Sequence, residues 1–190
     1  DGITTAEIQE ILIRAASDLI DLDHPNYQFV AARLLLFATR KQLYGRMHEV
    51  PTLKEHVERC VEKGVYDAEI LNLYTDEEFD KLQSYIDHHR DYLFTYAGLR
   101  QVVDKYLVQD RSSGALYETP QFMYILIAAT IFSKYPKETR LDYVKKYYDA
   151  ISKHKINIPT PIMAGVRTPL RQYASCVLID ADDTLDSIFT

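Results

Sequence analysis

The residues best suited to chemistry lie near the end of the chain, between positions 158 and 188. Cys176 follows Ser175 at the head of an apolar run, Thr160 stands between two prolines, and an acidic stretch surrounds Asp183. A thiolate can act as a nucleophile or exchange electrons with a second thiol. The plainer interpretations are a small buried cysteine on a strand, an ordinary threonine in a turn and a solvated acidic loop.

The sequence marks no second residue for either kind of thiol chemistry. Cys60 lies in a polar run more than a hundred residues before Cys176, and we expect it to be a half-buried helix residue. A cysteine hydrolase needs a general base. His154 is the histidine nearest to Cys176 in sequence, and nothing around it marks it as that base. His88 and His89 are consecutive, so on a helix they would point about 100° apart, and we expect no metal site.

The elements that must position these residues are mainly helices. Thr4 and Glu7 have the spacing of a capping box, and apolar residues recur at helical spacing after them. Thr75 and Glu78 repeat the same signal. The expected helices run from Thr4 to Ile20, from Pro25 to Gly45, from Pro51 toward Gly64, from Thr75 through His89, from Pro120 to about Ser133, and from Glu138 to Lys153.

Two regions predict strands instead. Residues 106–109 and 115–117 flank a loop that contains Gly114, which is typical of a β-hairpin. From Ile156 onward the helical periodicity is lost, and three prolines forbid a long helix. Residues 175–179 form a short apolar run with Val and Ile, which predicts a buried strand.

Composition limits the class of protein. The chain has 190 residues, 47% of them apolar, and a net charge of −6, so it can form a core and has no general attraction for nucleic acid or anionic membranes. We expect no membrane span and no signal peptide. Two cysteines are too few for a disulfide scaffold. These features favour a cytoplasmic protein. The chain begins without Met and ends directly after a motif, so we expect a piece of a longer protein.

A series of motifs runs along the end of this chain. They are Pro159 to Met163, Arg171-Gln172-Tyr173, Ala174 to Ile179 and Asp183 to Ile188, preceded by residues 31–34, 40–41, 105–109 and 138–141. This series resembles the large (alpha) subunit of class I ribonucleotide reductases, most closely the class Ia-like ribonucleoside-diphosphate reductases. The resemblance is specific, because several motifs follow in the family's order, and it covers essentially the whole chain.

The resemblance implies an N-terminal fragment with three parts. Residues 1–45 would be the C-terminal part of an ATP-cone regulatory domain, and residues 46–155 a helical domain with the small β-hairpin. Residues 156–190 would begin a ten-stranded α/β barrel that holds the catalytic site. The fold class implied is therefore mainly α, ending in the first strand region of the barrel.

The resemblance also assigns substrate-binding roles. Cys176 would be one of two cysteines that reduce the substrate ribose and end as a disulfide. Ser175 would contact the ribose, and Thr160 would bind the substrate phosphates through its hydroxyl and backbone donors. The radical cysteine and the second reducing cysteine should lie beyond Thr190.

Two regulatory nucleotide sites are implied as well. A nucleoside triphosphate at the specificity site would select which base is reduced, and another at the activity site would control overall activity. The specificity site would include Asp183, Thr184 and Leu185, and the activity site Thr5, Phe37 and Lys41.

As a member of this family, the intact protein would make deoxyribonucleotides by thiyl-radical chemistry. It would work as an alpha homodimer with a metal-containing beta subunit that supplies the radical, and with a thioredoxin- or glutaredoxin-type reductant. Its ligands would be ribonucleoside diphosphates and the effectors ATP and dNTPs, with no covalently bound cofactor. The fragment alone would be inactive. Two alternatives are a helical, nucleotide-regulated binding module without activity of its own and a cysteine hydrolase.

Overall fold

The computed structural model describes residues 2–45 and 49–189, and it confirms a mainly helical chain. Within these residues no strand is formed. The α-helices are α1 (Thr5–Asp18), α2 (Tyr27–Tyr44), α3 (Leu53–Glu62), α4 (Ile70–Leu73), α5 (Asp76–Tyr85), α6 (Tyr96–Gln101), α7 (Pro120–Phe132), α8 (Lys137–Ser152), α9 (Thr160–Gly165) and α10 (Leu185–Phe189). A 3-10 helix, η1 (His88–Leu93), and a π turn, η2 (Val102–Tyr106), lie between them.

Threonine capping boxes begin three of the helices. The boxes predicted at Thr4 and Thr75 are confirmed, because each threonine side chain accepts from a backbone N–H and a glutamate returns the bond. The helix expected from Pro51 has the same device, with Thr52 as its cap. Helix α2 ends at Gly45, which has a φ of 76°, a left-handed conformation that glycine adopts without strain.

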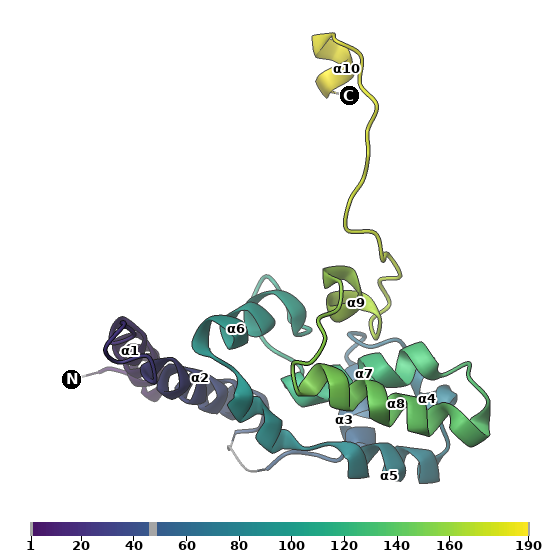
Figure 1. Cartoon of the computed structure of the whole chain (residues 1–190), viewed down its shortest axis with the longest axis horizontal. Helices are drawn as coiled ribbons and strands as arrows, with labels where there is room; N and C mark the ends of the chain where they lie inside the picture. The colour runs from purple at the N-terminus through teal and green to yellow at the C-terminus, as the bar shows by residue number, and fades with distance from the viewer. Residues whose placement is uncertain (1, 46–48, 190) are drawn as a thin grey trace.

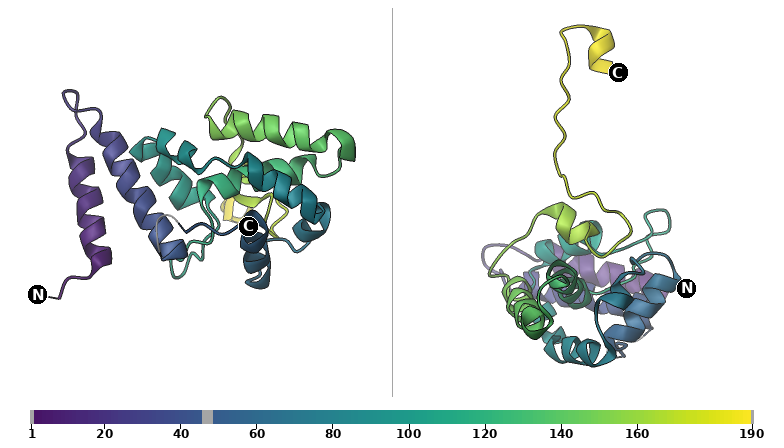
Figure 2. Two further views of the ribbon diagram at one scale, coloured as in Figure 1. Left: turned by 90° about the horizontal axis from the view of Figure 1, so that it is seen from below. Right: turned by 90° about the vertical axis from the view of Figure 1, so that its right-hand side faces the viewer.

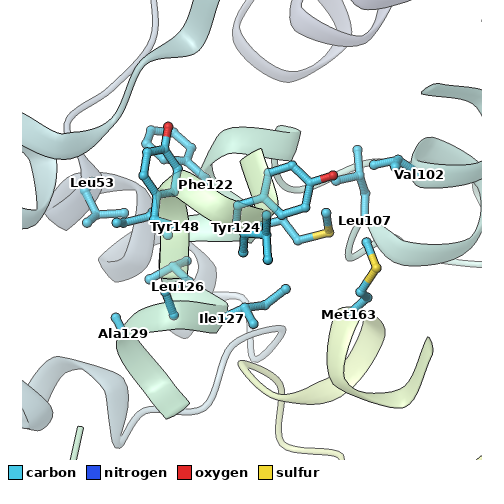
Figure 3. Close-up of a cluster of buried hydrophobic side chains, with 14 of the residues drawn as sticks. Leu53, Val102, Leu107, Phe122, Tyr124, Leu126, Ile127, Ala129, Tyr148 and Met163 are labelled. Carbon is cyan, nitrogen blue, oxygen red and sulfur yellow. The ribbon is translucent and has the colours of Figure 1, made fainter. Parts of the chain in front are cut away.

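Helix α7 is the centre of the core. Its residues from Pro120 to Ala129 are buried on all sides, as expected for a helix without a polar face. It packs against α8, α9 and η1. Figure 3 shows its side chains meeting those of the surrounding elements, and the labelled residues are Leu53, Val102, Leu107, Phe122, Tyr124, Leu126, Ile127, Ala129, Tyr148 and Met163.

Helices α1 and α2 form a hairpin at one edge of the molecule (Figures 1 and 2). Helix α2 joins this hairpin to the body, because it packs against α6 and η1. A buried ion pair strengthens the contact, with Arg40 Nη2 2.9 Å from Asp91 Oδ2. Helix α1 contacts α2 and leaves Ile8, Ile11 and Leu12 exposed on its outer side.

The prediction of a single helix from Thr75 through His89 is wrong in its second half. Helix α5 ends at Tyr85, and Ile86 takes an extended conformation. The backbone N–H of Asp87 donates to the Tyr148 hydroxyl at 2.9 Å, and the Asp87 side chain accepts from the N–H of His89. These two bonds replace the backbone hydrogen bonds that would continue α5 through Asp87, so η1 begins as a separate turn.

The expected β-hairpin is reduced to one antiparallel bridge between Gln109 and Leu116. Backbone bonds on either side of it join Asp110 to Ala115 and Tyr117 to Val108. The ladder does not extend into strands because the N–H of Val108 donates to the Glu118 carboxylate, at 2.7 Å.

Beyond Arg171 the chain leaves the body as a C-terminal arm (residues 172–189), which is extended until it reaches α10 (Figures 1 and 2). The buried strand expected over residues 175–179 is not formed, and Leu178 is 100% exposed. A strand needs neighbours for its backbone hydrogen bonds, and no other segment of the described chain lies alongside this one.

Candidate functional site

Cys176 lies in the extended part of the arm and is an exposed free thiol. The hydroxyl of Ser175 is 3.8 Å from the Cys176 sulfur. The apolar residues that follow are exposed as well, with Val177 at 72% and Ile179 at 81%. The two residues predicted to face the ribose are therefore adjacent, and the segment that carries them has the apolar composition of a covered strand.

The arm begins at an ion-pair cluster on the surface of the body. One guanidinium nitrogen of Arg171 lies 2.6 Å from the carboxylate of Asp67 and 2.9 Å from that of Glu69. Arg171 is itself 63% exposed, so water screens these pairs and their contribution to stability is small. Their effect is to fix the point at which the arm leaves the body.

Thr160 is the first residue of α9. The carbonyl of Pro159 accepts the first backbone bonds of the helix, from Ile162 at 3.0 Å and Met163 at 3.1 Å. Thr160 is exposed. Because Ile162 and Met163 already bond to Pro159 and Pro161 has no N–H, the donors of this turn that remain for a ligand are the hydroxyl and the backbone N–H of Thr160.

A fully buried ion pair anchors the end of α9. Arg167 Nε donates to Glu118 Oε2 at 2.7 Å, and a second bond joins Arg167 Nη2 to Glu118 Oε1. The guanidinium also donates to the carbonyl of Met163 at 2.5 Å and to that of Tyr106 at 3.0 Å. Burial opposes the charge on Arg167, but the Glu118 carboxylate outweighs it and raises the pKa of the guanidinium.

The buried network continues from Glu118 toward α3. The Tyr66 hydroxyl donates to Glu118 and lies 3.0 Å from His56 Nε2. Burial lowers the pKa of His56 to about 3, and the cations Arg59 and Arg167 add to the effect. The imidazole is therefore neutral at physiological pH, and its ring stacks on Phe122 at 4.3 Å.

Cys60 lies against this network and is 1% exposed, so the expectation of a half-buried residue is wrong. Its sulfur is 3.7 Å from the carbonyl of Tyr117, so the packing of α3 against the segment around Tyr117 shields the thiol from solvent. Burial, with a smaller contribution from Glu118, raises the pKa of the thiol to about 12. Cys60 is therefore a structural thiol that stays protonated near neutral pH.

The residues predicted for the specificity site lie at the far end of the arm. The Thr184 hydroxyl accepts from the backbone N–H of Ser187 at 3.2 Å, so it caps α10. The Ser187 hydroxyl accepts in return from the N–H of Asp182, at 2.8 Å. Asp183 and Leu185 are exposed beside this cap.

The residues predicted for the activity site lie where α1 begins and α2 ends. Lys41 Nζ is 3.4 Å from the Thr5 hydroxyl, so the helix hairpin brings these two side chains together. Phe37 lies four residues before Lys41 on α2, so both point from one face of that helix. The lysine ammonium lies beside the start of α1, where the free N–H groups of a helix also attract anions.

The predicted site residues thus occupy three separate parts of the molecule. Thr5 and Lys41 meet on the α1–α2 hairpin, and Thr160 lies on α9. The arm carries residues 175–185 away from α9, as Figure 1 and the right-hand view of Figure 2 show. The structure therefore does not bring Thr160 and Cys176 together.

Sequence reasoning missed the buried polar residues that hold these parts in place. Besides Glu118 and Arg167, a second network joins Asp91 to Arg40 and to Gln121, whose amide lies 2.8 Å from the Asp91 carboxylate. Partners far apart in sequence give no periodic signal. The one available signal was Glu118 itself, an acidic residue directly before an apolar helix.

Across residues 2–45 and 49–189, no group of three or more His, Cys, Asp and Glu side chains is arranged to hold a metal ion. In the same part of the chain, no helix combines the length and apolarity needed to cross a bilayer.

Comparison with known proteins gives this chain its family. Residues 92–171 match the sequence model described as the all-alpha domain of ribonucleotide reductase. Over 188 residues the chain is 56% identical to ribonucleoside-diphosphate reductase 1 subunit alpha of Escherichia coli (strain K12), 55% identical to the alpha subunit of Haemophilus influenzae and 48% identical to that of Enterobacteria phage T4. Each match covers 99% of this chain and 25% of the relative.

The chain thus spans about a quarter of the length of the curated relatives it matches. High identity along nearly the whole chain, together with the match to the helical domain, agrees with the order of motifs in the sequence. The chain therefore belongs to the ribonucleotide reductase family, as a portion of an alpha subunit.

Proposed function

We propose that the intact alpha subunit to which this chain belongs reduces ribonucleoside diphosphates to 2'-deoxyribonucleotides for DNA synthesis. The observation that carries the proposal is the 56% identity to the Escherichia coli reductase alpha subunit along 99% of this chain. Because the match covers nearly the whole chain, it includes the motifs around Thr160 and Cys176. By itself this chain has no activity, because it lacks the radical cysteine and a partner thiol for Cys176.

In this proposal Cys176 is one of the two reducing thiols. A thiyl radical on a cysteine elsewhere in the subunit abstracts the 3'-hydrogen of the substrate ribose. The 2'-hydroxyl leaves as water after taking a proton from the thiol pair. The pair then supplies two electrons and its second proton to the ribose and becomes a disulfide. The abstracted hydrogen returns to the 3'-carbon, which restores the thiyl radical, and a thioredoxin- or glutaredoxin-type dithiol reduces the disulfide for the next turnover.

The substrate would be held by residues on both sides of the junction between α9 and the arm. Thr160 binds the diphosphate through its hydroxyl and its backbone N–H. Ser175 contacts the ribose next to Cys176. For these contacts to form together, the arm must fold back toward α9, which a barrel built around it would impose.

The regulatory sites follow from the same assignment. Asp183, Thr184 and Leu185 form part of the specificity site, where a nucleoside triphosphate selects the base to be reduced. Thr5, Phe37 and Lys41 form part of the activity site, and the 3.4 Å contact between Lys41 and Thr5 supports a shared site for a triphosphate.

The proposed organisation has three parts. Residues 1–45 are the end of an ATP cone, residues 46–155 a helical domain and residues 156–190 the start of a ten-stranded barrel. Residues 175–179 become a barrel strand when the other strands are present. The apolar surface of Val177 and Ile179 supports burial in such a barrel.

The working enzyme would be an alpha homodimer in the cytoplasm. A metal-containing beta subunit supplies the radical, and ATP and dNTPs bind as effectors. The alpha subunit itself carries no covalent cofactor, and no membrane or nucleic acid takes part.

The test is the Cys176→Ser substitution in the intact alpha subunit, assayed with beta, a ribonucleoside diphosphate and a dithiol reductant. We expect multiple turnovers to be lost, because a serine hydroxyl cannot form the disulfide. Cys60→Ala is the matched control and should turn over normally. Normal turnover by Cys176→Ser would refute the assignment. A protein that binds neither a diphosphate nor a triphosphate would instead indicate a binding module.

A further inference from the structure

A cavity of about 370 Å³ lies between α6, η2 and the connection from α8 to α9. Val102, Ile151 and Met163 give it apolar walls from three different elements. None of the residues predicted for the substrate or regulatory nucleotide sites lines it. A cavity of this size fits a small organic ligand, so its polar groups decide which class of ligand suits it.

Tyr124 brings an unsatisfied hydroxyl to this cavity. The residue is 4% exposed and lines the cavity, yet its hydroxyl bonds to no group in the part of the chain that the structure describes. Figure 3 shows its oxygen directed toward Val102, another lining residue. The other buried tyrosines all donate, Tyr66 to Glu118, Tyr74 to the Ala129 carbonyl and Tyr148 to Gln121. A buried hydroxyl without a partner is unfavourable, and an acceptor on a ligand would satisfy it.

His154 forms an aromatic wall of the cavity in a conformation that favours glycine. Its φ is 55°, and its N–H donates to the carbonyl of Ile151 at 3.0 Å where α8 ends. A glycine would end the helix in this way without strain. The imidazole instead packs on the ring of Phe94 with centroids 4.5 Å apart, and both rings line the cavity. The strained position thus carries a ring that a planar ligand can contact.

The charge of the lining favours an anion. Lys155 is in the lining and pairs with no carboxylate of the described residues, and the lining includes no Asp or Glu. The side-chain oxygen of Asn157 already accepts from the N–H of Ile158, at 3.0 Å, so its amide nitrogen is left as a donor. An exposed cation and an amide donor therefore stand at the mouth, and the buried phenol of Tyr124 stands at the floor.

We propose that this cavity binds a small aromatic carboxylate that carries a hydroxyl at the end of its ring system opposite the carboxylate. The carboxylate pairs with the Lys155 ammonium at the mouth. The rings lie between the apolar walls and the imidazole of His154. The hydroxyl oxygen of the ligand accepts from Tyr124 at the floor. This site is additional to the nucleotide sites of the function proposed above.

The experiment uses the intact alpha subunit with CDP and an effector triphosphate at saturating concentrations, so that the nucleotide sites are filled. The probe is 6-hydroxy-2-naphthoate, titrated by saturation-transfer NMR. We expect a Kd of about 1 mM or tighter, which is modest for a ligand of this size. The neutral 6-hydroxy-2-naphthamide has the same shape without the charge and should bind about two- to fivefold more weakly.

Lys155→Met tests the mouth of the cavity. It should weaken binding of 6-hydroxy-2-naphthoate about two- to fivefold and leave binding of the neutral amide unchanged, because only the carboxylate pairs with the lysine. Lys153→Met is the matched control. Lys153 lies two residues away, its ammonium is 3.8 Å from the Asp149 carboxylate, and it is not part of the lining. We expect this control to bind both probes normally.

Tyr124→Phe tests the floor. It should weaken binding of 6-hydroxy-2-naphthoate about two- to tenfold and leave binding of 2-naphthoate, which has no hydroxyl, unchanged. The thermal midpoint of unfolding should not fall, because the lost hydroxyl bonds to nothing in the described chain. Tyr148→Phe, which removes a bonded hydroxyl, should lower that midpoint. No binding of the probe to the nucleotide-saturated subunit, or normal binding by both Lys155→Met and Tyr124→Phe, would overturn the proposal and leave the proposed reductase function untouched.

Discussion

Glu118 and Arg167 form an ion pair in which neither side chain is exposed to solvent, although 49 residues separate them in the chain. The carboxylate precedes α7, the central helix, and the guanidinium follows α9, which carries Thr160. The pair therefore fixes the helix predicted to bind substrate to the core of the helical part.

Breaking this pair should be costly. Glu118→Gln leaves a buried guanidinium without its counter-charge, and we expect it to lower the free energy of unfolding by about 3–5 kcal/mol. Removing both charges with Glu118→Leu and Arg167→Met should cost less than the sum of the two single changes. Urea denaturation of this chain followed by circular dichroism measures the free energy of unfolding of all four variants.

The exposed pair of Arg171 and Asp67 is the matched comparison for this prediction. Arg171→Ala should lower the free energy of unfolding by less than about 1 kcal/mol, since solvent screens the pair. Equal losses from the buried and the exposed pair would contradict the argument from burial.

The two cysteines should differ sharply in reactivity. Cys176 is exposed, whereas Cys60 is buried and has a pKa raised to about 12. At about pH 8 only roughly one Cys60 thiol in 10⁴ is ionised, and the thiolate is the form that reacts. Brief treatment with iodoacetamide should therefore modify Cys176 and spare Cys60 until the chain is unfolded in urea. Peptide mass spectrometry locates the label, and rapid labelling of native Cys60 would count against the burial described.

Stability should fall as the pH is lowered through the range in which unfolded histidines titrate. The pKa of His56 is held near 3 by burial, so the folded chain takes up this proton only at about that pH, whereas the unfolded chain takes it up below about 6.5. The free energy of unfolding therefore decreases as pH falls from about 6.5 toward 3, by up to roughly 1.4 kcal/mol per pH unit for this group. His88, with a pKa lowered to about 4 by burial, acts in the same direction.

His56→Gln isolates the contribution of this one residue. Glutamine can bond to Tyr66 but takes up no proton, so the slope of stability against pH should become shallower between about pH 6.5 and 4. Urea denaturation at several pH values gives both slopes. Identical slopes for the two proteins would show that His56 is not the group responsible.

The cap at Thr52 offers a local test of helix α3. Its hydroxyl accepts from the N–H of Glu55 at 3.3 Å, and the Glu55 carboxylate accepts from the N–H of Thr52 at 2.9 Å. Thr52→Ala should lower the free energy of unfolding by about 1 kcal/mol, and Thr52→Ser by only a few tenths, because serine keeps the acceptor. Equal losses for the two variants would show that the hydroxyl is not acting as a cap.

Local signals predicted much of the helical part correctly. The boxes at Thr4 and Thr75, the stop at Gly45 and the apolar helix after Pro120 are set by residues close in sequence. The break at Ile86 escaped prediction because its cause is the distant Tyr148 hydroxyl, which takes the N–H of Asp87. The hairpin strands were expected because the sequence gives no sign that Glu118 takes the N–H of Val108.

In the candidate site, too, the sequence predicted features set by nearby residues and missed those set by distant contacts. Motif order pointed to Thr160 and Cys176, and their roles stay predictions. The contacts that hold α9 in place were invisible in the sequence, because Arg167, which bonds to the Met163 carbonyl, reaches Glu118 only in the folded chain.

The C-terminal arm has a consequence for the behaviour of this chain in solution. Val177, Leu178 and Ile179 present a short, uncharged, apolar segment whose backbone donors and acceptors have no strand beside them. Such an edge can pair with its equivalent on another molecule. Concentrated preparations should therefore self-associate through the arm, and a lysine at position 178 should keep them monomeric in sedimentation experiments.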